Sequence, residues 1–240
     1  MTNISISIDN IHNKNCPPSH FSSTGYYFKF ERIVSPYGGE VGCEILLDFI
    51  KAREVIGGAV KKQYENAIAN GFALEVLIKK LIDSKRAMHT PRLFINIERS
   101  YLCNENLLKK IAILDKRLHL NGVELVLEIT ERNQCGKCAH IDAGLQQLKD
   151  LGIALAADDF DIYNGDFRFN EVMSGVYDYI KIEAPTNKLD RKLFNNFIIK
   201  TLHLKKKIII EKVEDSAVLN GLFTPFGIQG YAYGTSPVQL

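Results

Sequence analysis

The apolar residues of this chain gather in eight short runs that have the length and composition of β-strands. The runs cover residues 26–34, 42–49, 92–98, 124–130, 153–160, 177–183, 206–213 and 227–234. Between them, apolar residues recur with helical spacing in the segments 59–84, 105–118, 139–152 and 191–204. Strands that alternate with helices predict crossover connections and a mainly parallel sheet.

Eight strand-like runs in 240 residues fit an α/β fold of the (β/α)₈ TIM-like barrel type, whose lower size limit is about 200 residues. A doubly wound open sheet is the alternative. It is less favoured because no glycine-rich phosphate-binding sequence follows the early strands. The polar residues 1–22 are expected to form an N-terminal arm, and residues 23–240 the barrel domain.

Charge and composition exclude some classes of protein. The 30 basic and 28 acidic residues nearly balance, which gives no reason to expect binding to nucleic acid or to a membrane surface. No apolar run approaches the roughly 20 residues that span a bilayer, and the N-terminus lacks the pattern of a secretory signal. Five cysteines at scattered spacings favour free thiols and a cytoplasmic location.

Polar residues interrupt the apolar runs near the end of every strand after the first. Buried charges are costly unless they are paired or bind a metal, and only one of these residues is basic. Carboxylate and amide oxygens favour Mg²⁺ or Mn²⁺, and two such ions with a bridging aspartate are typical of phosphoester cleavage. The residues are Glu44, Asn96, Glu128, Asp158 with Asp159, Lys181, Glu211 and Gln229.

Seven short motifs occur in the order and at the spacing of a known family. They read GCEILLDF, FINIERSYL, LVLEITER, LAADDF, YDYIKIE, IIEKVED and GIQGYAYGTSPV. On these motifs the chain resembles EAL-domain phosphodiesterases, which hydrolyse cyclic di-GMP to linear pGpG. The resemblance covers roughly residues 25–238 and implies a barrel with a modified first strand, of which a homodimer can form.

The resemblance also implies a role for each site residue. Glu44, Asn96, Glu128 and Asp158 would bind a first Mg²⁺ or Mn²⁺, with Asp158 bridging to a second ion at Asp159. Lys181 would orient or deprotonate the attacking water, and Glu211 would support the second metal or its water. The remaining implied positions are Gln229, Leu46 and Arg32 for substrate binding and Glu131 and Glu214 as supporting acids.

Some positions depart from the family pattern. Near the first strand, Glu31 and Arg32 stand where glutamine and proline are usual, and that glutamine normally helps to hold the nucleotide. Asp48 replaces an arginine that contacts ligand phosphate, and we expect weakened substrate binding that Arg32 compensates in part. The loop 161–166 lacks the family's glycines, and Ile162 and Tyr163 cannot readily take a positive φ, so the loop must adopt another shape. Lys212 also replaces a glycine. The alternatives are therefore a non-catalytic receptor for cyclic di-GMP, a protein-binding regulator, or another metal-dependent hydrolase.

Two further features have simpler interpretations. Cys135 and Cys138 form a CxxC motif, but no second pair completes a zinc site, so incidental free thiols are favoured over zinc or redox chemistry. The run 205–207 consists of three lysines between a helix and a strand. It is expected to be the solvated end of that helix.

Overall fold

The computed structural model describes residues 26–56, 60–83, 90–130, 139–230 and 238–239. The predicted N-terminal arm lies outside these residues. The strands are β1 (Phe28–Val34), β2 (Glu40–Leu47), β3 (Arg92–Ile97), β4 (Glu124–Ile129), β5 (Ala154–Ala157), β6 (Tyr179–Glu183), β7 (Lys207–Glu211), β8 (Gly227–Ile228) and β9 (Val238–Gln239). The α-helices are α1 (Phe49–Ile56), α2 (Val60–Ala69), α3 (Phe72–Asp83), α4 (Glu105–Leu120), α5 (Ala139–Asp150), α6 (Phe169–Ser174) and α7 (Lys188–Thr201). Short 3₁₀ helices are η1 (Arg99–Cys103), η2 (Leu202–Leu204) and η3 (Ser216–Leu219).

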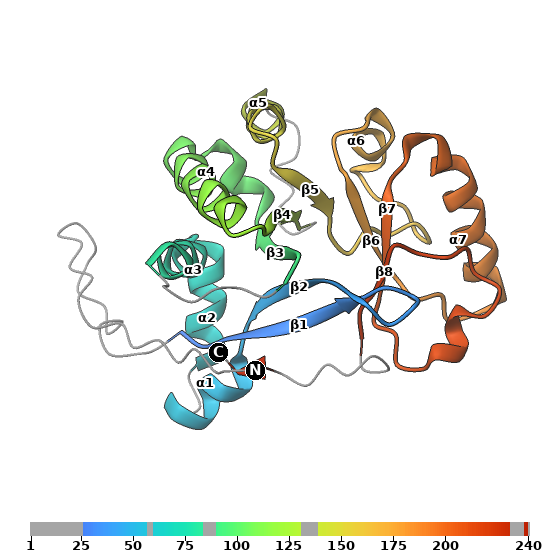
Figure 1. Ribbon diagram of the computed structural model, residues 1–240, viewed down its shortest axis with the longest axis horizontal. Coiled ribbons are helices and arrows are strands. Elements are labelled where there is room, and N and C mark those ends of the chain that lie inside the picture. The colour runs from blue at the N-terminus through green and yellow to red at the C-terminus, as the bar shows by residue number, and fades with distance from the viewer. Residues whose placement is uncertain (1–25, 57–59, 84–89, 131–138, 231–237, 240) are drawn as a thin grey trace.

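The sheet closes on itself through its first strand. Strands β2 to β8 follow one another in order and pair in parallel, while β1 runs antiparallel between β8 and β2. Helices lie around the strands, with α3 and α7 on opposite sides of the view in Figure 1. The predicted barrel and its modified first strand are therefore confirmed. Because β1 runs antiparallel to its neighbours, its later residues lie level with the earlier residues of the other strands.

Local sequence signals account for the starts of two helices and for one break between helices. Asn104 caps α4 by accepting a hydrogen bond from the Leu107 backbone, and Asn187 caps α7 in the same way. The segment 59–84, which has one continuous helical period, forms two helices instead. Gly71 takes a φ of 79° at the break, a left-handed conformation that ends α2 before α3 begins.

The barrel interior contains an apolar layer that is separate from the main core. Its six side chains come from six strands, contact one another and are fully buried: Ile33, Phe94, Val126, Ala156, Tyr179 and Ile209. The main core lies between the sheet and the helices. Because side chains alternate along a strand, the residue two positions after each layer member on a parallel strand also points into the barrel.

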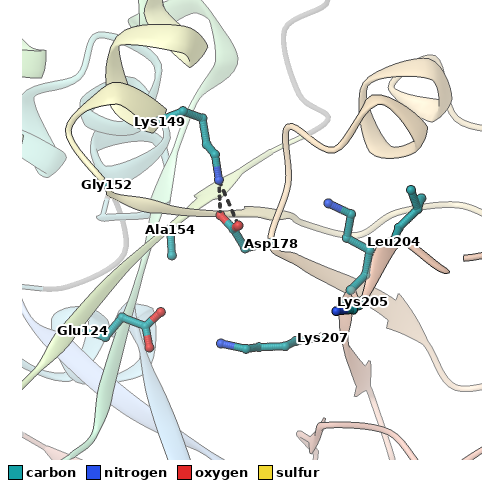
Figure 2. A pocket seen from close by; sticks show the side chains of 9 residues that line it. Glu124, Lys149, Gly152, Ala154, Asp178, Leu204, Lys205 and Lys207 are labelled. Carbon is teal, nitrogen blue, oxygen red and sulfur yellow. Dashed lines mark hydrogen bonds and ion pairs between the residues drawn. The ribbon is translucent and has the colours of Figure 1, made fainter. Parts of the chain in front are cut away.

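A cavity of about 270 Å³ lies at the amino ends of β4 and β7, away from the ends where the site was predicted (Figure 2). Three of its four lysines bind polar groups of the protein. Lys149 pairs with Asp178 at 2.8 Å, Lys206 donates to the Tyr177 carbonyl, and Lys207 donates to the Tyr179 hydroxyl at 2.9 Å. The cavity thus belongs to the base of the barrel. Lys207 is part of this base and not the solvated helix end expected from the sequence.

No helix in the described ranges combines the length and apolar character that crossing a membrane requires.

The packing of α5 on η1 depends on a glycine. A Cβ at Gly144 would lie 2.2 Å from the Leu102 carbonyl oxygen. We expect Gly144→Ala to lower the free energy of unfolding by about 1–3 kcal/mol through overpacking, more than the helix propensity of about 1 kcal/mol that alanine adds. Gly39→Ala, where the nearest atom is 3.6 Å away, is the control for denaturant unfolding. Equal stability of the two variants would contradict the close contact.

Candidate active site

A polar layer lies directly above the apolar layer, towards the carboxyl ends of the parallel strands. Most of its members are two residues beyond a member of the apolar layer, as the strand period of two requires. The polar layer comprises Glu31, Glu44, Asn96, Glu128, Asp158, Lys181, Glu211 and Gln229. Seven of these eight positions were predicted as site residues. Glu31 was not, but the antiparallel register pairs it with Glu44 and so brings it to the same face.

Lys181 occupies the centre of the polar layer and is fully buried. Its ammonium Nζ contacts a carboxylate oxygen from each of four strands or strand ends. The four distances are 2.6 Å to Glu128, 2.8 Å to Glu211, 3.0 Å to Glu44 and 3.3 Å to Asp158. Four carboxylates therefore share one positive charge in a space that water hardly enters.

The pKa values in the layer reflect this imbalance. Burial raises the pKa of Asp158 to about 6 and that of Glu211 to about 8, because Lys181 offsets only part of the desolvation. Burial and the neighbouring Glu44 raise the pKa of Glu128 well above its ordinary value. Burial alone would also raise the pKa of Glu44, but Lys181 and Gln229 outweigh it and lower this pKa.

The donor set fits a divalent cation. In the described part of the chain, the acids do not form a ready-made metal cluster but converge on Lys181. Oxygen Oε2 of Glu128 and Oε2 of Glu211 are buried and have no hydrogen-bond partner among the described residues. Unpaired carboxylate oxygens beside an excess of negative charge are what Mg²⁺ or Mn²⁺ would satisfy.

Two amides join the carboxylates of the layer. Asn96 donates to Glu44 at 2.6 Å, and Gln229 donates to Glu44 at 2.7 Å and to Glu31 at 3.3 Å. The Gln229 carbonyl oxygen Oε1 is buried and lacks a partner within the described ranges. It is therefore available to a water molecule or ligand at the site.

The two adjacent aspartates contact different cations. Asp158 is buried and contacts Lys181, whereas Asp159 has a half-exposed side chain and lies 3.2 Å from Lys212 Nζ. Asp159 has a φ of 44°, a left-handed conformation that is uncommon outside glycine. Such an outlier is typical of functional sites, where the surrounding structure holds the strained residue in place.

A family model described as the EAL domain matches residues 33–235, which include every strand of the barrel from the end of β1 to β8. The chain belongs to the EAL domain family. Each residue of the EAL motifs quoted from the sequence can now be placed, where the structure describes it.

Curated relatives are similar over part of their length. The probable cyclic di-GMP phosphodiesterase PdeA of Escherichia coli (strain K12) is 27% identical over 170 residues, which are 67% of this chain and 23% of PdeA. The cyclic di-GMP phosphodiesterase PdeF of the same organism is 22% identical over 173 residues, 68% of this chain and 23% of PdeF. This chain thus spans about a quarter of the length of these relatives.

Solved structures agree on the fold. The EAL domain of FimX from Pseudomonas aeruginosa, bound to c-di-GMP, has a TM-score of 0.64 at 20% identity, covering 90% of this chain and 91% of that one.

The loop after the aspartate pair is held by a buried arginine that the sequence did not indicate. Arg168 is fully buried and donates to the carbonyl oxygens of Ile129 at 2.6 Å and Asp158 at 2.8 Å. Asp166 accepts from the same guanidinium at 2.6 Å. Arg168 therefore fastens the carboxyl ends of β4 and β5, which carry Glu128 and Asp158. Its signal in the sequence, an aspartate two residues before an arginine, is too common to be noticed.

The loop 161–166 is organised by the side chain of Asp161. Asp161 accepts hydrogen bonds from the backbones of Tyr163 and Asn164, and the positive φ falls on Gly165 at 98°. Ile162 keeps an ordinary negative φ, as expected for a β-branched residue.

Arg32 does not face the site as predicted, and Asp48 has a structural contact of its own. Asp48 is buried and caps α1, since its Oδ1 accepts from the Lys51 backbone at 2.9 Å. Arg32 pairs with Cys43 in the register, on the face opposite Glu31 and Glu44, and donates to Glu40 at 3.0 Å. The idea that Arg32 compensates for Asp48 at the substrate is therefore corrected. Period-two alternation along β1 is the reason that Arg32 faces away from the barrel interior.

The other predicted positions are more peripheral. Leu46 is half-buried and two residues beyond Glu44 on β2, and Glu214 is exposed beyond β7. Glu131, Cys135 and Cys138 lie outside the described residues. Among the described cysteines, Cys43 is a buried thiol on β2.

The excess of buried acid predicts how the metal-free protein responds to pH. Asp158, Glu128 and Glu211 retain protons in the folded state that an unfolded chain releases near pH 4. The folded state binds more protons between about pH 5 and 8, so stability should fall as pH rises through this window. Glu44, with its lowered pKa, stabilises above its unfolded pKa and is already fully ionised there.

The measurement is the unfolding midpoint in a chelator from pH 5 to 8. Glu211→Gln should flatten the upper part of the curve, and Mn²⁺ should stabilise most at the alkaline end, where the carboxylates are ionised. Stability that rises with pH in the chelated protein would contradict the assignment.

The cap at α1 predicts the effect of changing Asp48. Asp48→Ala should cost about 1 kcal/mol of unfolding free energy, and Asp48→Arg more, since a buried position receives a charge. Asp48→Asn, which can still cap, should be close to wild type in denaturant unfolding. Glu54→Ala on the exposed face of α1 is the control. If Asp48→Arg proves as stable as wild type, Asp48 does not anchor the helix.

Proposed function

We propose that this chain is a metal-dependent phosphodiesterase that hydrolyses cyclic di-GMP to linear pGpG. The observation that carries the proposal is the buried cluster of four carboxylates around Lys181, which remains short of positive charge. Its EAL relatives PdeA and PdeF support the substrate, since their names describe them as cyclic di-GMP phosphodiesterases. None of the departures from the family pattern replaces an acid that we propose to bind the ion.

Four residues of the polar layer would hold the ion, namely Glu44, Asn96, Glu128 and Asp158. A bound Mg²⁺ or Mn²⁺ would activate water for attack on phosphorus and stabilise charge on the phosphoryl oxygens. The protein contributes a rigid set of oxygen ligands. Each sits on a strand or strand end, and Arg168 fixes the backbones that carry Glu128 and Asp158.

Lys181 is suited to orienting groups and less suited to removing a proton. Burial lowers its pKa, but Glu128, Glu211 and the other carboxylates outweigh burial and raise the pKa well above its ordinary value. A protonated ammonium has three donors and no lone pair. Lys181 would therefore donate hydrogen bonds to the attacking water or to a phosphoryl oxygen, where fixed donors stabilise developing charge.

Glu211 and Gln229 would complete the position of the water. Oxygen Oε2 of Glu211 and Oε1 of Gln229 both lack a hydrogen-bond partner in the described part of the chain. Both accept hydrogen bonds, so together they can align the two protons of one water molecule. Burial raises the pKa of Glu211 to about 8, so Glu211 carries a proton at neutral pH in the metal-free chain and would accept hydrogen bonds once a bound cation favours its ionised form.

The test is the rate of pGpG formation from cyclic di-GMP with Mn²⁺ or Mg²⁺. Glu128→Gln keeps the size of the side chain but removes a charge, and kcat should fall by about 10²-fold or more. Lys181→Met should lower kcat by about 10²-fold while the Kd for cyclic di-GMP, measured by calorimetry in Ca²⁺, changes less. Glu105→Gln on the exposed surface of α4 is the matched control and should be fully active.

Each possible result separates the proposal from its alternatives. Full turnover after exhaustive chelation, or unchanged activity in Glu128→Gln, would refute the metal-dependent mechanism. Wild-type binding of cyclic di-GMP without turnover would identify a non-catalytic receptor. Neither binding nor turnover would favour a protein-binding regulator.

A further inference from the structure

Lys212 combines an unusual backbone conformation with a position beside the polar layer. It follows Glu211, the last residue of β7, and takes a φ of 55° in the left-handed region. A side chain in that region is strained, and glycine adopts it without cost. The contacts of the Lys212 ammonium group hold the residue in this strained conformation.

Those contacts lead to the rim of the polar layer. Lys212 Nζ lies 3.2 Å from Asp159 Oδ1 and also pairs with Glu183, the last residue of β6. Asp159 adjoins Asp158, whose carboxylate contacts Lys181. Two lysines therefore contact two consecutive aspartates. Lys181 on β6 contacts Asp158 in the interior, and Lys212, which follows β7, contacts Asp159 at the rim.

An ammonium group at this place opposes a divalent ion on Asp159. Oxygen Oδ1 of Asp159 accepts from Lys212, so the ammonium already offsets part of the charge with which Asp159 would attract an ion. An ion near Asp159 would also meet the repulsion of a like charge at short range. The charge of Lys212 affects Asp158 less, because Asp158 is buried and contacts Lys181. The unpaired oxygens of the layer also lie around Lys181 and not at the rim.

We infer that Lys212 supplies, as part of the chain, the positive charge that a second divalent ion would bring to Asp159. The chain then takes one divalent ion, held by Asp158 and its buried neighbours, and Asp159 is not a metal ligand. This inference rests on the proposed function, because it concerns the same metal site.

The experiment counts Mn²⁺ ions per chain in chelator-treated full-length protein, by calorimetry and by the electron paramagnetic resonance of bound Mn²⁺. Wild type should bind one ion. Lys212→Gly removes the ammonium, suits the left-handed backbone and should bind two ions, with the spectrum of a coupled pair. Lys212→Arg keeps the charge and should bind one.

Lys205 provides a matched control. It is also an exposed lysine with a left-handed φ, 52°, but it precedes β7 at the opposite end of the strand. Lys205→Gly relieves the same kind of backbone strain and should still bind one ion.

The outcomes distinguish this inference from the proposed function. Two ions in wild type would leave the metal site standing and overturn the role of Lys212, as would a single ion in both wild type and Lys212→Gly. No ion in either protein would overturn both the metal site and the inference.

Discussion

One buried ammonium group among four carboxylates is the interaction on which the site depends. Lys181 lies within 3.3 Å of all four acids, yet it supplies a single positive charge. Taking charges out of water is costly unless partners compensate them. The barrel interior therefore requires protons or a further cation at this level, and both the expected pH response and the proposed metal site follow from that deficit.

The apolar layer makes this deficit tolerable and useful. Six fully buried side chains beneath the polar layer exclude water from below and fix the strands that carry the acids. A dry, rigid surrounding strengthens every electrostatic interaction above it. The barrel as a whole offsets the unfavourable layer through its two cores, which is the usual relation between a destabilised site and its scaffold.

The sequence was sufficient for the barrel and for seven of eight positions in the polar layer, because period-two alternation is a local property. It was insufficient where the answer depends on long-range register or on side-chain reach. The register of the reversed β1 against β2 decides that Glu31 points inside and that Arg32, by alternation, points away. The clamp formed by Arg168 depends on backbone carbonyls at the ends of two strands, which only the structure brings together.

Most positions that depart from the family pattern lie at the rim of the barrel. Asp48, the loop 161–166 and Lys212 follow the carboxyl end of a strand, whereas Glu31 lies inside the barrel, and none of them replaces an acid that we propose to bind metal. At the rim each new residue has acquired a partner of its own: a helix end, a buried arginine or Asp159. Such a distribution fits a change in how substrate enters and in how many ions the polar layer holds. It fits a loss of the proposed metal-dependent reaction less well.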